Sequence, residues 1–233
     1  SAQPLTMTKQ KSVISALAAV MILGTSLDTD AANPGRKKRS ARRTVPTERK
    51  ATPPEPKDTD VPILGESLVS PESMWEFVKT KNIDFPYEIA EAFFIVGERY
   101  GIRGDIALCQ AILETGWFEF SGGTAVTPDQ HNYCGLGVTS LGKKGHSFES
   151  IYEGVTAQIQ HLYAYACKSS LPEGEQIVDP RFKYVKRGVA PSWESLNLRW
   201  AANDKYGQSI LALYSRMLSN SGLSPLQPID QLD

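Results

Sequence analysis

The sequence predicts a mainly helical domain that carries one small β-hairpin lobe, an α+β fold. Two observations support this prediction. Apolar side chains recur at helical spacing in several segments between residues 70 and 222, and a Gly-rich stretch with few helix formers, residues 117–149, interrupts them. With 233 residues, of which 41% are hydrophobic and 22% charged, the chain can bury one sizeable core and still carry segments that need not fold.

The first 32 residues are predicted to be a signal peptide. Met7 begins a short region with two lysines, and an apolar run from Val13 to Leu27 follows it. A run of about fifteen apolar residues suits a signal-peptide core and is short for a membrane span. Small residues then appear at Ala31-Ala32. The alternatives are an uncleaved anchor or a buried helix. Once the signal is cleaved, we expect no membrane span.

Residues 33–69 are predicted to be a disordered, basic, Pro-rich linker. Residues 31–60 contain nine Lys or Arg against four Asp or Glu, and almost no large apolar side chains. Such a segment cannot bury enough surface to offset the entropy lost on ordering. One alternative interpretation of the basic cluster at residues 36–43 is that it binds nucleic acid. Behind an export signal we expect instead a solvated spacer, or a tether attracted to an anionic wall or membrane surface, and no nucleic acid.

Residues 70–222 are predicted to form the folded domain. A helix begins at Ser70-Pro71, because a hydroxyl caps the first turn and proline suits the first helical position. A second helix spans residues 86–100, and a third runs from residue 103 or 105 to 115. A glycine directly after each of these two helices favours its end.

The β-hairpin is predicted at residues 135–138 and 145–148, which pair as short strands across a Gly-rich turn. Ser150 and Glu153 then form a capping box that opens a long helix to about Lys168.

The remaining elements complete the domain. A short helix is predicted at residues 192–198, and the last helix runs from Asn203 or Asp204 to Leu218. Residues 223–233 are treated as a C-terminal tail.

The cysteine and histidine pattern indicates no metal centre. Cys109, Cys134 and Cys167 leave open one disulfide with one free thiol, or no disulfide at all. No Cys and His spacing resembles a metal site, so we expect no metal. The oligomeric state is left open.

The most informative segment is residues 110–117, Gln-Ala-Ile-Leu-Glu-Thr-Gly-Trp. It places a lone carboxylate, Glu114, at the end of an apolar helix, just before Gly116 and Trp117. Poor solvation and the negative end of the helix dipole both raise the pKa of such a carboxyl group, toward the protonated state that a general acid must hold. The alternative is a structural carboxylate in a salt bridge.

An ordered set of motifs extends this picture. Between residues 88 and 215 the chain resembles the bacterial peptidoglycan glucosaminidases, glycoside hydrolase family 73. The motifs, in order, are Glu114-Thr115-Gly116-Trp117, residues 131–137 (His-Asn-Tyr-Cys-Gly-Leu-Gly), Ser147-Phe148, Gly154-Val155, Gln160-His161-Leu162, Asp179-Pro180-Arg181-Phe182, Arg187-Gly188 and residues 200–207 (Trp-Ala-Ala-Asn-Asp-Lys-Tyr-Gly).

The resemblance implies a lysozyme-like fold and cofactor-free hydrolysis of the peptidoglycan bond after N-acetylglucosamine. It implies that Glu114 is the general acid and Tyr206 the cleft tyrosine of the catalytic site. We further expect five residues to bind substrate or orient the acid: Gln110, Trp117, Asn132, Tyr133 and Gly135. Turn chemistry is the alternative role of Asn132, and core packing is that of Trp117 and Tyr206.

The second catalytic group stays open at this point. Glu149, Glu119 and Asp129 are candidates, and the acetamido oxygen of the substrate is the alternative, because attack by that oxygen removes the need for a protein nucleophile. Two other functions remain: a lytic transglycosylase, and a non-catalytic module that binds peptidoglycan. The expected location is secreted, periplasmic or associated with the cell wall.

Overall fold

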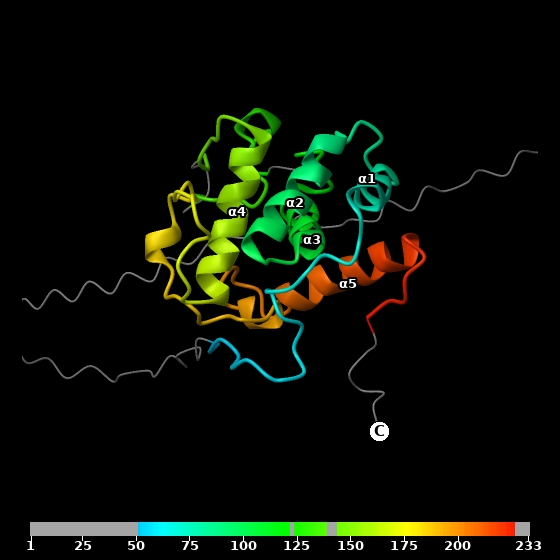
Figure 1. Cartoon of the computed structure of the whole chain (residues 1–233). Helices are drawn as coiled ribbons and strands as arrows, with labels where there is room; N and C mark the ends of the chain where they lie inside the picture. Colours follow the sequence, from blue (N-terminus) through cyan, green and yellow to red (C-terminus); the bar gives the residue numbers. More distant parts are fainter. Residues whose placement is uncertain (1–50, 122–123, 139–143, 227–233) are drawn as a thin grey trace, which may run out of the picture.

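The computed structural model describes residues 51–121, 124–138 and 144–226 (Figure 1). The predicted signal peptide lies outside the described residues, as do residues 33–50 of the linker and 227–233 of the tail. The described part is mainly helical, as predicted. Its helices are α1 (Pro71–Lys79), α2 (Tyr87–Tyr100), α3 (Gly104–Thr115), α4 (Ile151–Ala166) and α5 (Tyr206–Asn220), with short 3-10 helices η1 (Pro128–Gln130), η2 (Phe182–Tyr184) and η3 (Glu194–Leu196).

Helix α3 lies in the middle of the helical part, where it contacts α1, α2 and α5, while α4 packs against α2 (Figure 1). Ten of the twelve residues of α3 are buried. An α-helix that is apolar around most of its circumference belongs inside a domain. The core extends from α3 to large side chains on every neighbouring element, among them Phe93, Tyr133, Trp193, Trp200 and Tyr214.

Local sequence signals account for the helix boundaries. Ser70 Oγ accepts a hydrogen bond from the backbone N–H of Ser73 at 3.3 Å, which caps α1 as predicted. Gly101 and Gly116 end α2 and α3 in the left-handed conformation, each with φ of +61°. Helix α5 begins later than expected, at Tyr206, because Asn203 Oδ1 accepts from the backbone N–H of Lys205 and holds a turn there. The short helix expected at residues 192–198 is only the 3-10 turn η3.

The folded part begins earlier than the predicted linker boundary at residue 69. Ile63 and Val69 are buried in the core, with 0% and 1% of their surface exposed. Asp105 Oδ2 accepts from the backbone N–H of Leu68 at 2.8 Å, and Ile63 accepts from the backbone N–H of Arg103. The linker expectation therefore needs correction for residues 61–69, whose few apolar side chains find partners that lie far along the chain.

The predicted β-hairpin is not confirmed, because the described residues contain no strand. One backbone hydrogen bond, from His146 N–H to Leu136 O at 2.8 Å, joins its two expected arms, and residues 139–143 lie outside the described part. Gly135 and Gly137 have φ of +68° and +83°, which interrupts an extended strand. The side chain of Asn132 joins the two arms instead.

Within the described ranges, no helix combines the length and the apolar character that crossing a bilayer would require.

Candidate active site

Glu114 lies in the last turn of α3 and is partly exposed, unlike most of that helix. Its neighbours Ile112 and Thr115 are buried. The helix therefore carries the carboxylate from the core to the surface, where a ligand can reach it. None of the described Lys or Arg residues forms an ion pair with Glu114. The alternative of a structural salt bridge thus finds no support in this geometry.

Tyr206 is the first residue of α5, and its hydroxyl donates a hydrogen bond to Glu114 Oε1. The tyrosine ring is buried, with 2% of its surface exposed. Close packing holds the start of this helix, because a Cβ atom on Gly207 would lie 2.2 Å from the carbonyl oxygen of Trp193. The backbone N–H of Gly207 also donates to Asn197 Oδ1 at 2.7 Å. The sequence-predicted acid and tyrosine therefore meet.

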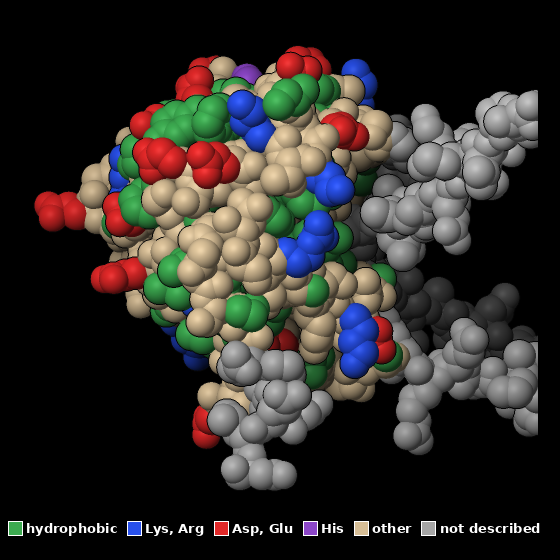
Figure 2. All heavy atoms as spheres, turned by 90° about the vertical axis from the view of Figure 1, so that its right-hand side faces the viewer, with side chains coloured by type: hydrophobic (Ala, Val, Ile, Leu, Met, Phe, Trp, Pro, Cys, Tyr) green, Lys and Arg blue, Asp and Glu red, His purple; other side chains and the backbone are tan. Residues whose placement is uncertain are grey.

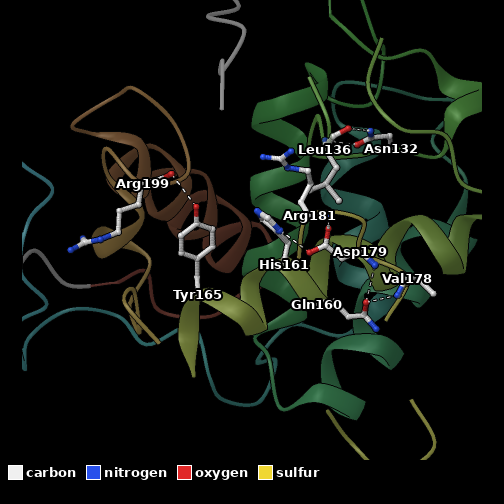
Figure 3. Close-up of polar contacts among 9 residues, drawn as sticks. All are labelled: Asn132, Leu136, Gln160, His161, Tyr165, Val178, Asp179, Arg181 and Arg199. Carbon is white, nitrogen blue, oxygen red and sulfur yellow. Dashed lines mark hydrogen bonds and ion pairs between the residues drawn. The ribbon is translucent and has the colours of Figure 1, made fainter. Parts of the chain in front are cut away.

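The side chain of Trp200 also acts on Glu114 and lowers the pKa of its carboxyl group. The Trp200 ring is buried and packs edge-on against His161, with ring centroids 4.8 Å apart. His161 Nδ1 lies 2.7 Å from Asp179 Oδ2, and both side chains are buried. Figure 3 shows this pair, with Arg181 beside it; the backbone N–H of Arg181 donates to the other oxygen of Asp179. Asp179 thus orients the histidine that supports Trp200.

Burial raises the pKa of Glu114 from its ordinary value of 4.5 to about 7. The hydrogen bond from Tyr206 and the side chain of Trp200 lower that pKa, and the loss of solvation outweighs both effects. The direction agrees with the expectation from the sequence. A carboxyl group with a pKa near 7 holds its proton at slightly acidic pH and can give it up to an acceptor, which suits a general acid.

The buried thiol of Cys134 lies within electrostatic reach of Glu114 and Tyr206. Burial raises the pKa of Cys134, and the charge of Glu114 raises it further. Tyr206 in turn has its pKa raised by burial and by the Glu114 charge, with a smaller effect of Cys134. The thiol is therefore neutral and packs as part of the site's interior. Cys109, Cys134 and Cys167 are all free, so no disulfide forms among them.

Gln110, one turn before Glu114, is fully buried. Its Nε2 donates to the Tyr206 hydroxyl at 2.9 Å, and its Oε1 accepts from Gln158 Nε2 at 2.9 Å. Both ends of this amide are engaged within the protein. In this structure Gln110 supports Tyr206 and does not face a ligand.

The loop of Asn132, Tyr133 and Gly135 forms the neighbouring part of the site. Asn132 is buried; its amide donates to Leu136 O and His146 O, and accepts from the Leu136 N–H at 3.0 Å. These contacts, of which Figure 3 shows those with Leu136, are the turn chemistry weighed above. Tyr133 is buried between aromatic rings of α2 and of the segment after α3.

Trp117 points away from Tyr206. Its ring packs against Phe77, with centroids 5.3 Å apart, and beneath Arg216 at 5.6 Å. Arg216 lies ten residues beyond Tyr206, which is about 15 Å along the axis of α5. A surface hollow lies on this same α1–α5 side. Figure 2 shows this face, on which basic side chains run down the right half and most acidic ones gather on the left.

The candidate second carboxylates are all exposed: Glu119, Asp129 and Glu149. In the part of the chain that the structure describes, none of these three carboxylates forms a hydrogen bond with Glu114 or Tyr206. Thr127 beside Asp129 lowers the pKa of that carboxyl group and keeps it ionised. No group of three His, Cys, Asp or Glu that could hold a metal ion occurs in the described ranges.

Trp200, Gln158 and Cys134 are site neighbours that the sequence reasoning did not single out. Trp200 stands in the same motif as Tyr206, so its place there was a usable signal. Gln158 is a polar residue on a buried stretch of a long helix, a pattern that indicates a satisfied amide inside the core.

Comparison with known proteins agrees with the motif set. Residues 90–219 match the family model Glucosaminidase, described as mannosyl-glycoprotein endo-beta-N-acetylglucosaminidase. An uncharacterized protein of Borreliella burgdorferi is 42% identical over 118 residues, which is 51% of this chain and 56% of that protein. The chain therefore spans about half the length of this curated relative.

Among solved structures, the chain is similar to S. aureus autolysin E, crystallised in complex with the muropeptide NAM-L-Ala-D-iGlu. The TM-score is 0.46 at 12% identity, and the match covers 73% of this chain and 78% of that chain.

Proposed function

Because the chain belongs to the glucosaminidase family, we propose that it is an endo-β-N-acetylglucosaminidase that hydrolyses peptidoglycan glycan strands after N-acetylglucosamine. One observation carries the proposal: the partly exposed carboxyl group of Glu114 has no Lys or Arg ion-pair partner among the described residues and accepts a hydrogen bond from the buried, neutral Tyr206, while burial raises its pKa to about 7. The peptidoglycan substrate is supported by the ordered motifs at residues 114–207.

In the proposed reaction Glu114 acts as the general acid. It protonates the glycosidic oxygen as the bond to the sugar ring breaks and positive charge grows on that ring. After proton transfer the carboxylate is negative, and the hydrogen bond from Tyr206 stabilises it. This neutral donor therefore assists the step in which Glu114 loses its proton, whereas a Lys or Arg partner would have kept Glu114 ionised before the substrate arrived.

Sugar binding is proposed for the loop that contains Tyr133 and Gly135. Between them lies Cys134, close enough for its pKa to respond to the charge of Glu114. Through Cys134 this loop lies within electrostatic reach of the acid. Tyr133 and the side chain of Asn132 are buried, so we propose that they fix the loop and that its backbone groups meet the substrate.

For the second catalytic group, we propose that the substrate's own acetamido oxygen attacks the ring carbon. This fits the exposed positions of Glu119, Asp129 and Glu149, none of which hydrogen-bonds Glu114 or Tyr206. Single amide variants of the three test the proposal. Loss of activity in one of them, with an intact fold, would assign that carboxylate to activation of water instead.

The test of function is digestion of purified peptidoglycan by the full chain, followed by mass spectrometry of the released fragments. We expect N-acetylglucosamine at the new reducing ends, and no release by Glu114→Gln. Anhydromuramic ends would identify a lytic transglycosylase. Retention on peptidoglycan without release of fragments between pH 4 and 9 would identify a binding module and overturn the proposal.

We propose, from the apolar run at residues 13–27, that the protein acts outside the cytoplasm, in a secreted, periplasmic or wall-associated form. Fractionation of cells that produce the full chain tests this location, and recovery of the uncleaved protein in the cytoplasmic fraction would contradict it.

A further inference from the structure

A row of buried amide groups connects α4 to the acid through α3 and α5. Gln158 of α4 is fully buried, and its Nε2 donates to the backbone oxygen of Ala107 at 3.1 Å and to Gln110 Oε1 at 2.9 Å. Gln110 Nε2 donates to the Tyr206 hydroxyl at 2.9 Å, and that hydroxyl donates to Glu114. Four side chains from three helices thus form one continuous chain of hydrogen bonds.

The carbonyl oxygen of Ala107 sets the direction of every bond in this chain. A backbone carbonyl only accepts, so the NH₂ group of Gln158 must face it. The second N–H of that group then faces Gln110, which must present its own oxygen there. This leaves the NH₂ group of Gln110 for Tyr206. Since the hydroxyl oxygen of Tyr206 accepts from Gln110, its single proton points to Glu114.

We infer that Gln158, acting through Gln110, is a positioning residue that directs the Tyr206 hydroxyl proton toward Glu114 Oε1 and so leaves the proton of the acid on Oε2. Glu114 Oε1 accepts the hydroxyl proton of Tyr206, so the carboxyl proton of Glu114 is less stable on this oxygen than on Oε2. The carboxyl proton therefore occupies the oxygen that Tyr206 does not contact, where it is free for transfer.

The opposite direction would hold the proton inside the protein. If Gln110 turned its oxygen toward Tyr206, the hydroxyl would donate to Gln110 and could accept the proton of Glu114. The carboxyl proton would then lie on Oε1, in a hydrogen bond with Tyr206. This inference rests on the proposed function, in which Glu114 gives its proton to a sugar oxygen.

Packing alone does not account for an amide at this position. Gln158 Oε1 is buried and has no hydrogen-bond partner among the described residues. An unpaired buried acceptor destabilises a fold, whereas an apolar side chain of similar size would avoid that penalty. The two N–H donors of Gln158 are what the position uses, and one of them acts on Gln110.

The experiment compares Gln158→Met, Gln110→Met and the double variant with the wild type. Gln158→Met removes the N–H donor that fixes the orientation of the Gln110 amide, so this amide can rotate. Glu114 can then donate its proton to Tyr206, which stabilises the protonated form of Glu114. We expect kcat to fall about tenfold, less than the roughly 10²- to 10⁴-fold that general acid catalysis contributes, because the acid is misdirected and not removed, with KM within about twofold. The basic limb of the pH profile should move to higher pH. In the Gln110→Met background Tyr206 has no amide to donate to, so adding Gln158→Met should leave the limb unmoved.

Three further measurements separate positioning from general damage. Tyr214 lies on the same helix as Tyr206; its hydroxyl donates to Asp105 and accepts from Arg103. Tyr214→Phe removes both hydrogen bonds, so it should lower the melting temperature without moving the basic limb of the pH profile. NMR titration of the carboxyl-labelled Glu114 side chain gives its pKa without substrate. If Gln158→Met does not fold, Gln158→Asn serves, because it keeps the amide but cannot reach both partners.

A Gln158→Met protein with the kcat, pH limb and Glu114 pKa of the wild type would overturn the inference. The inference would also be overturned if Gln158→Met shifted the Glu114 pKa equally in the wild-type and the Gln110→Met backgrounds. If the wild-type chain releases nothing from peptidoglycan, the proposed function fails on its own, and the NMR titrations still decide the direction of the hydrogen-bond chain.

Discussion

The hydroxyl of Tyr206 hydrogen-bonds the carboxylate of Glu114, although 92 residues separate the two positions in the chain. One residue ends α3 and the other begins α5, and these two helices pack against each other. The fold thus places a neutral donor against a carboxyl group that burial keeps protonated up to a pH of about 7. A neutral donor stabilises the carboxylate after proton transfer without forcing it to ionise beforehand.

Replacement of Glu114 by glutamine should abolish fragment release. Glutamine keeps the size of the side chain and an oxygen for Tyr206 to donate to, but it has no acidic proton. General acid catalysis is worth about 10² to 10⁴ in rate, so we expect a fall of at least about 100-fold. Release of reducing ends from peptidoglycan measures this, and circular dichroism checks the fold. Unchanged release would remove Glu114 from the chemistry.

The rate should depend on pH through the same carboxyl group. Only the protonated form of Glu114 can donate, so activity should fall as the pH rises through about 7. Initial rates of peptidoglycan digestion between pH 4 and 9 at constant ionic strength test this. A basic limb near the ordinary carboxyl value would show that Glu114 is not the titrating group.

Tyr206→Phe should lower kcat and move the basic limb to higher pH. The Tyr206 hydrogen bond lowers the pKa of Glu114, so its loss raises that pKa. The carboxylate formed on proton transfer also loses a donor, and a hydrogen bond to a charged group is worth about 1.5–3 kcal/mol. The matched control is Tyr214→Phe, a buried tyrosine of the same helix. If both variants gave the same pH profile, Tyr206 would have only a packing role.

The helical part of the fold could be predicted because its signals are local. Ser70 at a cap and Gly116 after the last turn act within a few residues of the helix ends that they set. The position of Glu114 followed from the same signals, since an apolar helix that stops at a glycine brings its last carboxylate out of the core.

Other features depend on distant partners and could not be predicted locally. Ile63 lies in a Pro-rich, polar context, and only residues more than 30 positions away show that it is buried. The hairpin was predicted because a Gly-rich turn separates two short segments, residues 135–138 and 145–148, whereas the positive φ of Gly135 and Gly137 interrupts the first of these arms. Trp117 follows Glu114 in sequence, but a left-handed backbone with φ of +61° turns its ring toward α1.

Gly207→Ala should impair both the fold and the site. The new Cβ would lie 2.2 Å from the Trp193 carbonyl oxygen and 2.6 Å from Glu194 Cα, both backbone atoms that cannot move aside easily. Overpacking of this kind costs about 1–3 kcal/mol, and it would shift Tyr206 away from Glu114. Urea unfolding and the rate of digestion measure the two effects. Ser209→Ala, in the same helical turn, is the control, and a wild-type rate in Gly207→Ala would show that Tyr206 need not be held closely.

Glu114→Gln should also change how stability depends on pH. The folded pKa of Glu114 is about 7 and its ordinary value is 4.5, so between these pH values the folded protein holds a proton that the unfolded chain has released. The free energy of unfolding therefore falls as the pH rises through this window, and above it the ionised carboxylate destabilises the fold fully. Glutamine cannot ionise. The variant should be more stable than the wild type above pH 7, by about 1–3 kcal/mol.

Urea unfolding of both proteins at pH 4 and pH 8 measures this difference, with the exposed Glu119→Gln as the control. At pH 4, which lies below both pKa values, Glu114 is mostly protonated in the folded and the unfolded states, so the two proteins should then differ little. A stability difference of the same size at both pH values would mean that ionisation of Glu114 contributes nothing to it. The carboxyl group would then titrate as an ordinary surface acid, which a general acid working near neutral pH cannot do.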